Sequence, residues 1–537
     1  MTRLERWDVE DAAFWDATGK RIAYRNLWTS IPNLLCGFAV WMLWSALIVR
    51  IQTLHDGDPE LFAFPGPGGQ PLDGDAYRAL LYLLPAVAGL AGATLRIPNS
   101  FMVAISGGRN VKTLTTLLLI LPALGTGLAL QNPQTSFTTL LVLAALSGVG
   151  GGAFASSMSN ISFFFPKRIQ GLALGLNAGL GNLGVSVMQF MVPYVICFGV
   201  FGPLGGPGYA SSIGPVWIQN AGLAWVPILG VCATLAGLRM TNLPIHGCGP
   251  FPLAAVRYVW LELLGFAGAA AGIVLMLQLQ LPELIEMFLV VLAAVAVTLV
   301  LLRFATPQAI RGNLRKQFAV FRNKHNWVMT WLYVMTFGSF IGYSAAFPKL
   351  IADVFGYVRV DSNGVLLAEP MKLAEAPNAL TFAFLGALVG SLVRPIGGWL
   401  SDRFGGARVT HWDTLAMIVA ALGVAFCVMK ARFSPTPGTW FVPFLLLFLL
   451  LFVTTGIGNG STFRMIPIIF PKEQAGPVLG WTSAIAAYGA FLIPTVFATQ
   501  IKSGTPEYAM YGFVVYYVSC LLVNWWYYAR RGAEIVC

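Results

Sequence analysis

Two arginines occupy matching positions in otherwise apolar segments of this chain. Arg96 and Arg394 each lie eleven residues before a Gly-Gly pair, at a constant offset of 298 residues. Eleven helical residues rise about 16 Å, and half of a bilayer's hydrocarbon core is about 15 Å. Both guanidinium groups are therefore expected near the midplane of a membrane. An arginine at that depth needs a cavity or a partner, because inserting it costs at least about 2.5 kcal/mol.

The expected chemistry of these arginines is the binding of an anion. The sequence supplies no evident partner carboxylate for them in the twelve spans that form the core, and Glu262 falls in an added hairpin. Two buried cations without a protein counter-ion predict an anion from outside, and a planar oxyanion matches the guanidinium fork. The alternative is that each arginine donates to backbone carbonyls near a helix break, since Pro98 and Pro395 follow closely.

The stretch GGGAFASSMSN, residues 150–160, is unusually polar for a lipid-facing helix. Small residues let membrane helices approach closely, and serines can bond to the preceding turn or to a neighbouring helix. We expect the glycines and serines to serve packing. Phe154 is the one residue of the stretch that we place at the anion site.

The elements that position these residues are membrane-spanning helices. The chain has 537 residues, of which 57% are hydrophobic and only 10% are charged, whereas soluble domains carry roughly 25% charged residues. Fourteen segments are long and apolar enough to span a bilayer. The predicted spans are 33–53, 77–105, 113–130, 137–165, 171–198, 221–238, 258–278, 284–302, 328–348, 379–400, 412–429, 441–470, 478–500 and 509–527.

The net charge of +11 reflects topology. Basic stretches such as RLER, GKRIAYR, PKR and residues 311–324 fall in loops on one side, whereas the loop 54–76 has five acids and no Lys or Arg. This asymmetry predicts a membrane protein with both termini in the cytoplasm, and it excludes a nucleic-acid partner.

No cofactor is expected. The seven cysteines form no CxxC pair, and the four histidines fall in predicted loops, so that neither a metal site nor a haem is indicated.

The chain contains an internal repeat. The segment after Arg96 resembles the segment after Arg394, and residues 150–171 match 456–476 with FPK in register at an offset of 305 residues. Repeated halves with a midplane site between them are typical of transporters. We predict a cytoplasmic tail, a six-helix bundle, an inserted hairpin, a basic linker, a second six-helix bundle and a second tail: 1–32, 33–240, 241–302, 303–326, 327–527 and 528–537.

Several motifs resemble those of a known transporter family. GGWLSDRFGGARVT (397–410) resembles the loop signature of the major facilitator superfamily, and AISGGRNVKT is a degenerate copy that lacks the Asp-Arg pair. Residues 150–189 and 456–472 resemble the paired signatures of its nitrate/nitrite porter branch, of the NarK type, and GKRIAYRNLW, ATLRIP and residues 322–347 are also similar to it. The resemblance implies an all-α membrane protein with the major facilitator fold: two six-helix bundles related by pseudo-twofold symmetry, here with an inserted two-helix hairpin.

The resemblance also implies a set of site residues. Porters of this branch hold their anion between two arginines, with help from aromatic and amide side chains. The matching positions here are Phe154, Tyr333, Phe337 and Asn182. Aromatic walls narrow and dry a slot for a flat ion, and an amide N–H donates to its oxygen. Asn177 and Asn459 are further polar candidates, while each aromatic ring has ordinary packing as its alternative.

Asp402 and Arg403 lie in the predicted cytoplasmic loop of the signature motif. We expect them to be gate contacts that hold the inner ends of the bundles together. The alternative is a pair of solvated charges.

The function predicted from these features is nitrate/nitrite transport by alternating access. One anion neutralises two facing cations and lets the halves rock, which predicts nitrate uptake in exchange for nitrite. Nitrate/proton symport is the main alternative, a different transported anion is a second, and an anion-sensing receptor is a third. The predicted spans contain no nucleophile–base pair, so nothing in them indicates an enzyme. The expected partners are nitrate, nitrite and the lipid bilayer, and we expect a monomer.

Overall fold

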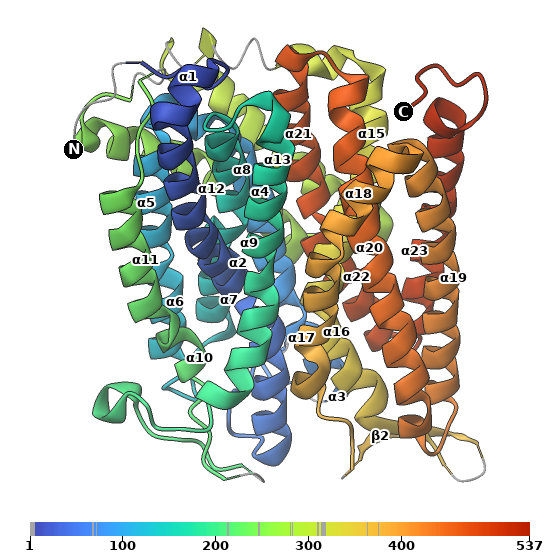
Figure 1. The fold of residues 1–537 in the computed structure, drawn as a ribbon. Helices are drawn as coiled ribbons and strands as arrows, with labels where there is room; N and C mark the ends of the chain where they lie inside the picture. Colours follow the sequence, from blue (N-terminus) through green and yellow to red (C-terminus); the bar gives the residue numbers. More distant parts are fainter. Residues whose placement is uncertain are drawn as a thin grey trace.

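The fold is an upright bundle of long helices (Figure 1). The structure, a computed structural model, describes residues 6–66, 69–70, 72, 74–211, 214–244, 248–279, 281, 283–308, 311–312, 318–361, 364–373 and 375–537.

The first part of the chain contains α1 (Ala12–Phe14), η1 (Trp15–Gly19), α2 (Lys20–Gly57), α3 (Gly74–Leu81), α4 (Leu83–Ser106), α5 (Gly108–Leu118), α6 (Ile120–Ala129), α7 (Phe137–Ser147), α8 (Val149–Ser162), α9 (Lys167–Val195), η2 (Gly202–Gly205), α10 (Asn220–Leu223) and α11 (Trp225–Arg239). Two further helices follow, α12 (Phe251–Gln278) and α13 (Glu283–Phe304).

The second part contains η3 (Phe318–Arg322), α15 (Lys324–Tyr333), η4 (Val334–Gly338), α16 (Ser339–Phe355), β1 (Tyr357–Val360), β2 (Leu366–Lys372), α17 (Ala379–Leu392), α18 (Arg394–Phe404), α19 (Gly406–Arg432), η5 (Pro437–Trp440), α20 (Phe441–Ile469), α21 (Lys472–Ala487), α22 (Gly489–Lys502), α23 (Glu507–Asn524) and η6 (Trp525–Ala529). The two strands pair antiparallel.

The helices are long enough to cross a membrane. Among the described residues, 12 helical runs meet the length and hydropathy that a span requires. The 29-residue α9 and the continuous run of α15, η4 and α16 add two more long helices. These runs coincide with the predicted spans. Helices are expected here because backbone groups in lipid must be satisfied within the segment.

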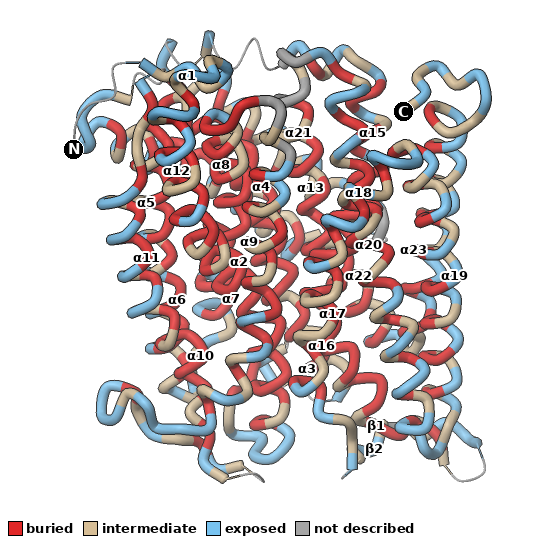
Figure 2. The backbone as a smooth tube through the Cα atoms, in the orientation of Figure 1, coloured by how far each residue is buried: buried red, intermediate tan, exposed pale blue. Residues whose placement is uncertain are grey.

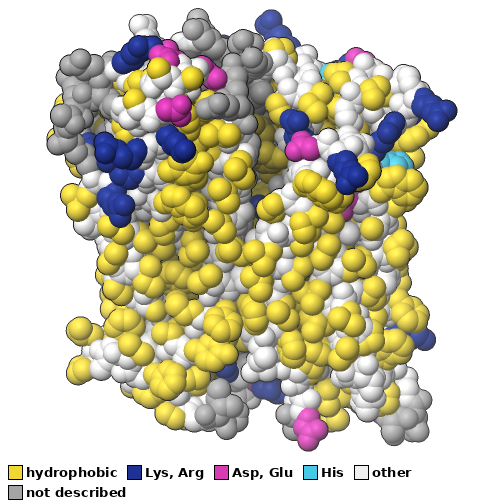
Figure 3. Space-filling model, viewed as in Figure 1, with side chains coloured by type: hydrophobic (Ala, Val, Ile, Leu, Met, Phe, Trp, Pro, Cys, Tyr) yellow, Lys and Arg dark blue, Asp and Glu magenta, His cyan; other side chains and the backbone are white. Residues whose placement is uncertain are grey.

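The surface supports this placement. Figure 3 shows a hydrophobic belt around the middle of the molecule and most visible Lys and Arg side chains at one end. Both termini lie at that end, and β2 and α3 lie at the opposite end (Figure 1). The buried side of each helix faces its neighbours, whereas loops and outward-facing turns are exposed (Figure 2). We call these two ends the terminus end and the far end.

The internal repeat is visible in backbone conformation. Gly107 and Gly405, which precede α5 and α19, have φ/ψ of 80/140° and 89/134°. Pro166 and Pro471, which precede α9 and α21, have −66/153° and −55/155°. The two predicted pairs of matching segments therefore form matching turns. The positive φ at Gly107 and Gly405 explains the glycines, because other residues rarely adopt it.

The inserted hairpin packs on the helix that carries Arg96. A Cβ atom on Gly265 of α12 would lie 2.7 Å from Leu95 Cδ2 and 2.9 Å from Pro98 Cγ, so α12 and α4 are in close contact. Asn99 Nδ2 donates to Glu262 Oε1 at 2.8 Å, and Glu262 is 2% exposed. The added carboxylate is thus bonded to a core helix.

Two sequence expectations are wrong in detail. α4 continues through Pro98 without a break, whereas a break does occur at Val393, between α17 and α18. Buried carboxylates are present in core helices, at Asp353 in α16 and Asp413 in α19. Asp353 lies beyond the predicted span 328–348, whereas Asp413 lies inside the predicted span 412–429 and was overlooked.

The histidines also differ from expectation. His325 lies in the first turn of α15, His411 lies within α19, and His55 lies in the last turn of α2, so these three are helical residues and not loop residues.

The glycine-rich stretch packs as predicted. A Cβ atom on Gly150 would lie 2.0 Å from the carbonyl oxygen of Gly37, so α8 and α2 touch through their backbones. Ser157 Oγ and Ser30 Oγ, on the same two helices, lie 2.9 Å apart. The polar groups of the stretch therefore bond to a neighbouring helix.

We expect Gly150→Ala to destabilise the protein by about 1–3 kcal/mol, because the added methyl group forces two helix backbones apart. Thermal unfolding in detergent should show a lower melting temperature. Gly175→Ala in α9 is the matched control, since its Cβ would have nothing within 4 Å. Equal melting temperatures for the two variants would contradict the close contact.

Candidate functional site

The two predicted arginines lie against one aromatic ring. The Cζ atom of Arg96 in α4 lies 4.8 Å from the ring centroid of Phe337, and that of Arg394 in α18 lies 5.6 Å from it. Arg96 is 0% exposed and Arg394 is 8% exposed. The structure therefore brings residues 298 positions apart to one buried location between the two halves.

Both guanidinium groups have unused donors. Arg96 Nε donates to the carbonyl oxygen of Gly151 at 3.0 Å, and its Nη1 donates to that of Ser483 at 3.1 Å. Arg96 Nη2, Arg394 Nε and Arg394 Nη2 are buried without a hydrogen-bond partner. Backbone carbonyls thus accept from part of the Arg96 guanidinium group, as the alternative to anion binding predicted. These carbonyls belong to α8 and α21, however, and not to a break in the helix of Arg96 itself. Unpaired buried N–H donors are costly, so they indicate an acceptor from outside.

Aromatic rings enclose the pair. Phe154 of α8 lies 4.6 Å from Arg96 Cζ and stacks on Phe337 with centroids 5.9 Å apart. Tyr333 also stacks on Phe337, with centroids 5.7 Å apart. The predicted residues Phe154, Phe337 and Tyr333 therefore form one continuous stack beside the arginines. Rings at this distance attract cations through their faces and exclude water.

Of the predicted amides, Asn459 is bonded to the aromatic stack. Its Oδ1 accepts from the hydroxyl of Tyr333 at 3.3 Å, which leaves its Nδ2 buried without a partner. Asn182 is 0% exposed, and both of its side-chain polar atoms lack partners. Asn177 differs, because its Nδ2 donates to Ser157 Oγ at 3.0 Å. Asn182 and Asn459 therefore retain unused donors, whereas Asn177 is held within the first half.

Two residues at the site were missed. Phe340 lies 4.4 Å from Arg394 Cζ, and Trp41 of α2 lies 5.5 Å from Arg96 Cζ. The spacing of 333, 337 and 340 puts these three rings on one helix face, and that pattern was available in the sequence. No local sequence pattern predicted that Trp41 would contact Arg96.

The expectation that no buried carboxylate lies in the core is wrong for Asp413. Asp413 is 7% exposed, and its Oδ2 lacks a partner. That oxygen would lie 2.6 Å from a Cβ atom on Gly458, next to Asn459 in α20. Among the described residues no salt bridge joins Asp413, or any other carboxylate, to Arg96 or Arg394. A buried acid is thus present in the second half, but it does not pair with the arginines.

Asp402 and Arg403 lie in the last turn of α18, so their predicted placement in a loop is wrong. Asp402 forms a salt bridge with Arg464 of α20, and both side chains are about half exposed. Arg403 packs over the rings of Trp399 and Phe404. Both contacts lie within the second half. The two residues are helical because α18 continues to Phe404 and ends only at Gly405, which has a positive φ.

A polar network ties the two halves together at the far end. Arg359 of β1 contacts both carboxylate oxygens of Asp75 at 3.1 and 3.2 Å, and Arg78 of α3 also pairs with Asp75. Asp56 accepts from the hydroxyl of Tyr357 at 2.7 Å and pairs with Lys372 of β2 at 3.0 Å. Acids at the end of α2 and the start of α3 thus meet bases of the strand pair, so the far end is closed.

Comparison with known proteins places this chain in a family. The profile of the Major Facilitator Superfamily matches residues 253–494. A protein of Thermus thermophilus described as a probable nitrate/nitrite antiporter is 39% identical, and the alignment spans 100% of this chain and 98% of that protein. The chain belongs to the nitrate/nitrite porter branch of the major facilitator superfamily. Another porter of this branch, the nitrate/nitrite transporter NarU of Escherichia coli, is 35% identical over 98% of this chain and 96% of its own.

The fold of this nitrate/nitrite porter homologue agrees with the assignment. The crystal structure of a D-xylose-proton symporter superposes with a TM-score of 0.59 at 14% identity, covering 96% of this chain and 98% of that chain. A likeness at this identity concerns the fold alone. Together with the family match it confirms the predicted major facilitator fold, and the long helices agree with a multi-pass membrane protein.

Proposed function

We propose that this porter exchanges nitrate and nitrite across the membrane, with the anion held between Arg96 and Arg394. The observation that carries the proposal is the set of buried, unpartnered N–H donors on two arginines that face the same ring. A planar anion with permanent charge accepts parallel hydrogen bonds from a guanidinium fork. The curated relatives described as nitrate/nitrite transporters support nitrate and nitrite as the substrates.

The remaining side chains have assigned roles in this proposal. Phe154, Phe337 and Tyr333 form the wall that keeps the slot narrow and dry. Asn459 and Asn182 donate to anion oxygens through their unused Nδ2 groups. Asn177 supports the site through its bond to Ser157 and is not a direct ligand.

Exchange follows from electrostatics. Without an anion, two cations in a low-dielectric site repel each other and oppose closure of the halves. A bound anion offsets that repulsion, so both halves can reorient only when loaded. Loaded passage in each direction is antiport, with nitrate entering as nitrite leaves.

The arrangement in the membrane is part of the proposal. The basic terminus end faces the cytoplasm of a bacterial inner membrane, in keeping with the distribution of Lys and Arg. The Asp402–Arg464 pair and Arg403 lie at that end and act in its gate when the halves close. The functional unit is a monomer, and residues 33–240 and 327–527 are the two moving bundles.

Nitrate/proton symport is the second candidate, and Asp413 is the observation that favours it. Its buried carboxyl in α19 has an oxygen without a hydrogen-bond partner and lies beside the helix that carries Asn459. Such a group can gain and lose a proton as the halves move, which is what proton coupling requires. The core helices therefore do contain a carboxyl group that could serve symport.

Counterflow in proteoliposomes distinguishes the two candidates. We expect vesicles loaded with nitrite to take up isotopically labelled nitrate, and empty vesicles to take up almost none, because the unloaded carrier cannot return. The measurement is initial uptake with and without an imposed pH gradient. Equal uptake by empty vesicles under a pH gradient would contradict exchange and support symport.

A further inference from the structure

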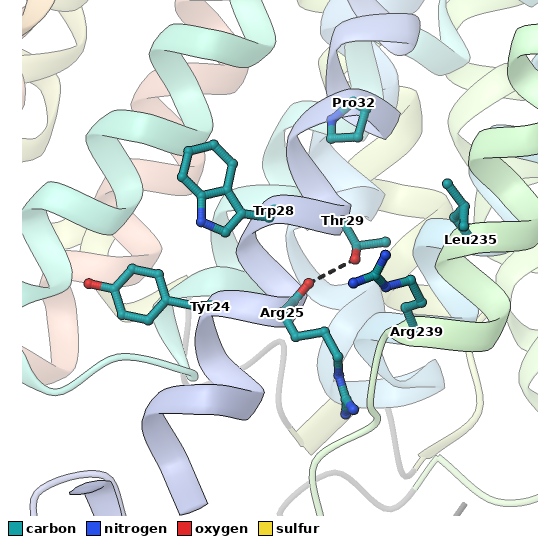
Figure 4. Close-up of a pocket in the computed structure, with 7 residues that line it drawn as sticks. All are labelled: Tyr24, Arg25, Trp28, Thr29, Pro32, Leu235 and Arg239. Carbon is teal, nitrogen blue, oxygen red and sulfur yellow. Dashed lines mark hydrogen bonds between the residues drawn. The ribbon is translucent and has the colours of Figure 1, made fainter.

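A second cationic cavity lies on the first half, away from the anion site. It has a volume of about 220 Å³ and is lined by residues of α2 and α11: Tyr24, Arg25, Trp28, Thr29, Pro32, Leu235 and Arg239. Figure 4 shows Tyr24 and Trp28 on one side of the cavity and Leu235 and Arg239 on the other.

The cavity opens toward lipid. Trp28 is 56% exposed and Leu235 is 37% exposed, although both belong to helices long and apolar enough to span a membrane. Arg25 lies near the start of α2, and Arg239 is the last residue of α11, so both lie at the terminus end. This is the level at which a bilayer changes from headgroups to acyl chains.

The donors in the cavity are in excess of the acceptors. Arg25 Nη2 donates to Thr241 Oγ1 at 2.9 Å, but its Nε is buried without a partner. Arg239 is exposed, and the lining contains no Asp or Glu. The hydroxyl of Thr29 is used within α2, where it donates to the carbonyl oxygen of Arg25 at 2.7 Å. The cavity therefore favours an anionic group.

The polarity of the lining changes along the membrane normal. From Arg25 to Pro32 the helix rises about 10 Å, and from Arg239 to Leu235 about 6 Å. Over that distance the lining passes from guanidinium groups, through the interfacial side chain of Trp28, to apolar groups. Trp and Tyr prefer this interfacial depth, and basic pockets between membrane helices bind lipid headgroups. A free anion would make no use of the apolar wall.

We propose that this cavity binds the phosphate headgroup of an anionic phospholipid. Arg25 and Arg239 contact the phosphate, Tyr24 and Trp28 lie beside the glycerol region, and Pro32 with Leu235 contacts the start of an acyl chain. The volume is below the range of roughly 300–1,000 Å³ that encloses whole drug-sized ligands, so the cavity takes the headgroup and the adjoining part of the lipid, while the rest of the acyl chains stays in the bilayer. The lipid bridges the start of α2 and the end of α11.

The test uses the purified full-length protein in detergent, titrated separately with phosphatidylglycerol, with phosphatidylcholine of the same acyl chains and with inorganic phosphate. Native mass spectrometry measures retained lipid, and thermal unfolding measures the melting temperature. We expect retention of phosphatidylglycerol only, together with a rise in melting temperature. Arg25→Gln and Arg239→Gln should each weaken retention about fivefold, the effect of one basic residue near an anionic lipid.

Arg531→Gln is the matched control, because Arg531 is exposed near the C-terminus and lines no part of the cavity. Trp28→Ala leaves the charge unchanged and should also lower retention, and nitrite-loaded counterflow confirms that each variant is folded. Wild-type retention in the Arg25→Gln/Arg239→Gln protein would overturn the proposal. Equal retention of phosphatidylcholine, or an equal rise in melting temperature with inorganic phosphate, would also overturn it.

Discussion

Replacing Arg394 by lysine is expected to lower nitrate counterflow by at least about tenfold, and Arg96→Lys is expected to do the same. Lysine keeps the positive charge but loses the planar fork, and a hydrogen bond to a charged group contributes about 1.5–3 kcal/mol. A loss of 1.4 kcal/mol is already a factor of ten. The measurement is the initial rate of labelled nitrate uptake by nitrite-loaded proteoliposomes, normalised to the amount of reconstituted protein.

The two variants should differ in stability. Arg96 also donates to the carbonyl oxygens of Gly151 and Ser483, which belong to different halves, so Arg96→Lys should lower the melting temperature. No such bonds are seen for the Nε and Nη2 atoms of Arg394, and Arg394→Lys should leave the melting temperature nearly unchanged.

Arg257→Lys in α12 is the control for charge-conserving replacement. Its Nη1 lies 3.4 Å from the carbonyl oxygen of Ile105, on the hairpin and away from Phe337. We expect transport at the wild-type rate. Wild-type counterflow in Arg394→Lys would show that the fork is not needed, and the anion clamp would then be wrong.

The positions of the two arginines could be predicted because they follow from local rules. A helix of eleven residues from Arg96 to the turn at Gly107, repeated from Arg394 to Gly405, fixes how far each arginine lies from its turn. The matching turn conformations come from the same residue type, glycine at positive φ. Periodicity and hydropathy report such features directly, and the spans were correct for the same reason.

Pairings between distant segments could not be predicted in this way. Asp413 lies inside the predicted span 412–429, but its burial against Gly458 depends on how α19 packs on α20. The contact of Glu262 with Asn99 depends on how the hairpin docks on α4. The position of Phe340 at the site could have been predicted from its spacing to Phe337. Trp41, in contrast, contacts Arg96 from another helix. Each of these contacts is set by helix packing and not by local sequence.

The far-end network shows what charge patterns alone leave undetermined. The sequence indicates an acidic, Lys- and Arg-free loop at 54–76, which we used only for topology. In the structure two of its acids pair with Arg359 and Lys372, which come from the strand pair of the other half. The same charges therefore hold the far end closed, and a transporter must break these contacts once in each cycle.

We expect Asp75→Asn to raise the ratio of far-end-open to far-end-closed conformations about five- to 150-fold. The variant removes the charge that Arg359 and Arg78 share, and loss of a charged hydrogen-bonded pair costs about 1–3 kcal/mol. The distance between spin labels at positions 60 and 365 reports the opening, in a background where the exposed Cys197 is replaced by serine. Double electron–electron resonance should show a longer-distance population that wild type lacks.

Glu507→Gln is the matched control for this shift. Arg432 and Glu507 form a salt bridge of 2.5 Å with side chains 15% and 3% exposed, but both residues lie in the second half. Loss of this pair should lower the melting temperature and leave the spin-label distances unchanged, because no contact between the halves is broken. If Asp75→Asn kept the wild-type distances, or if Glu507→Gln changed them equally, the far-end contacts would contribute to stability alone and would not set the conformational equilibrium.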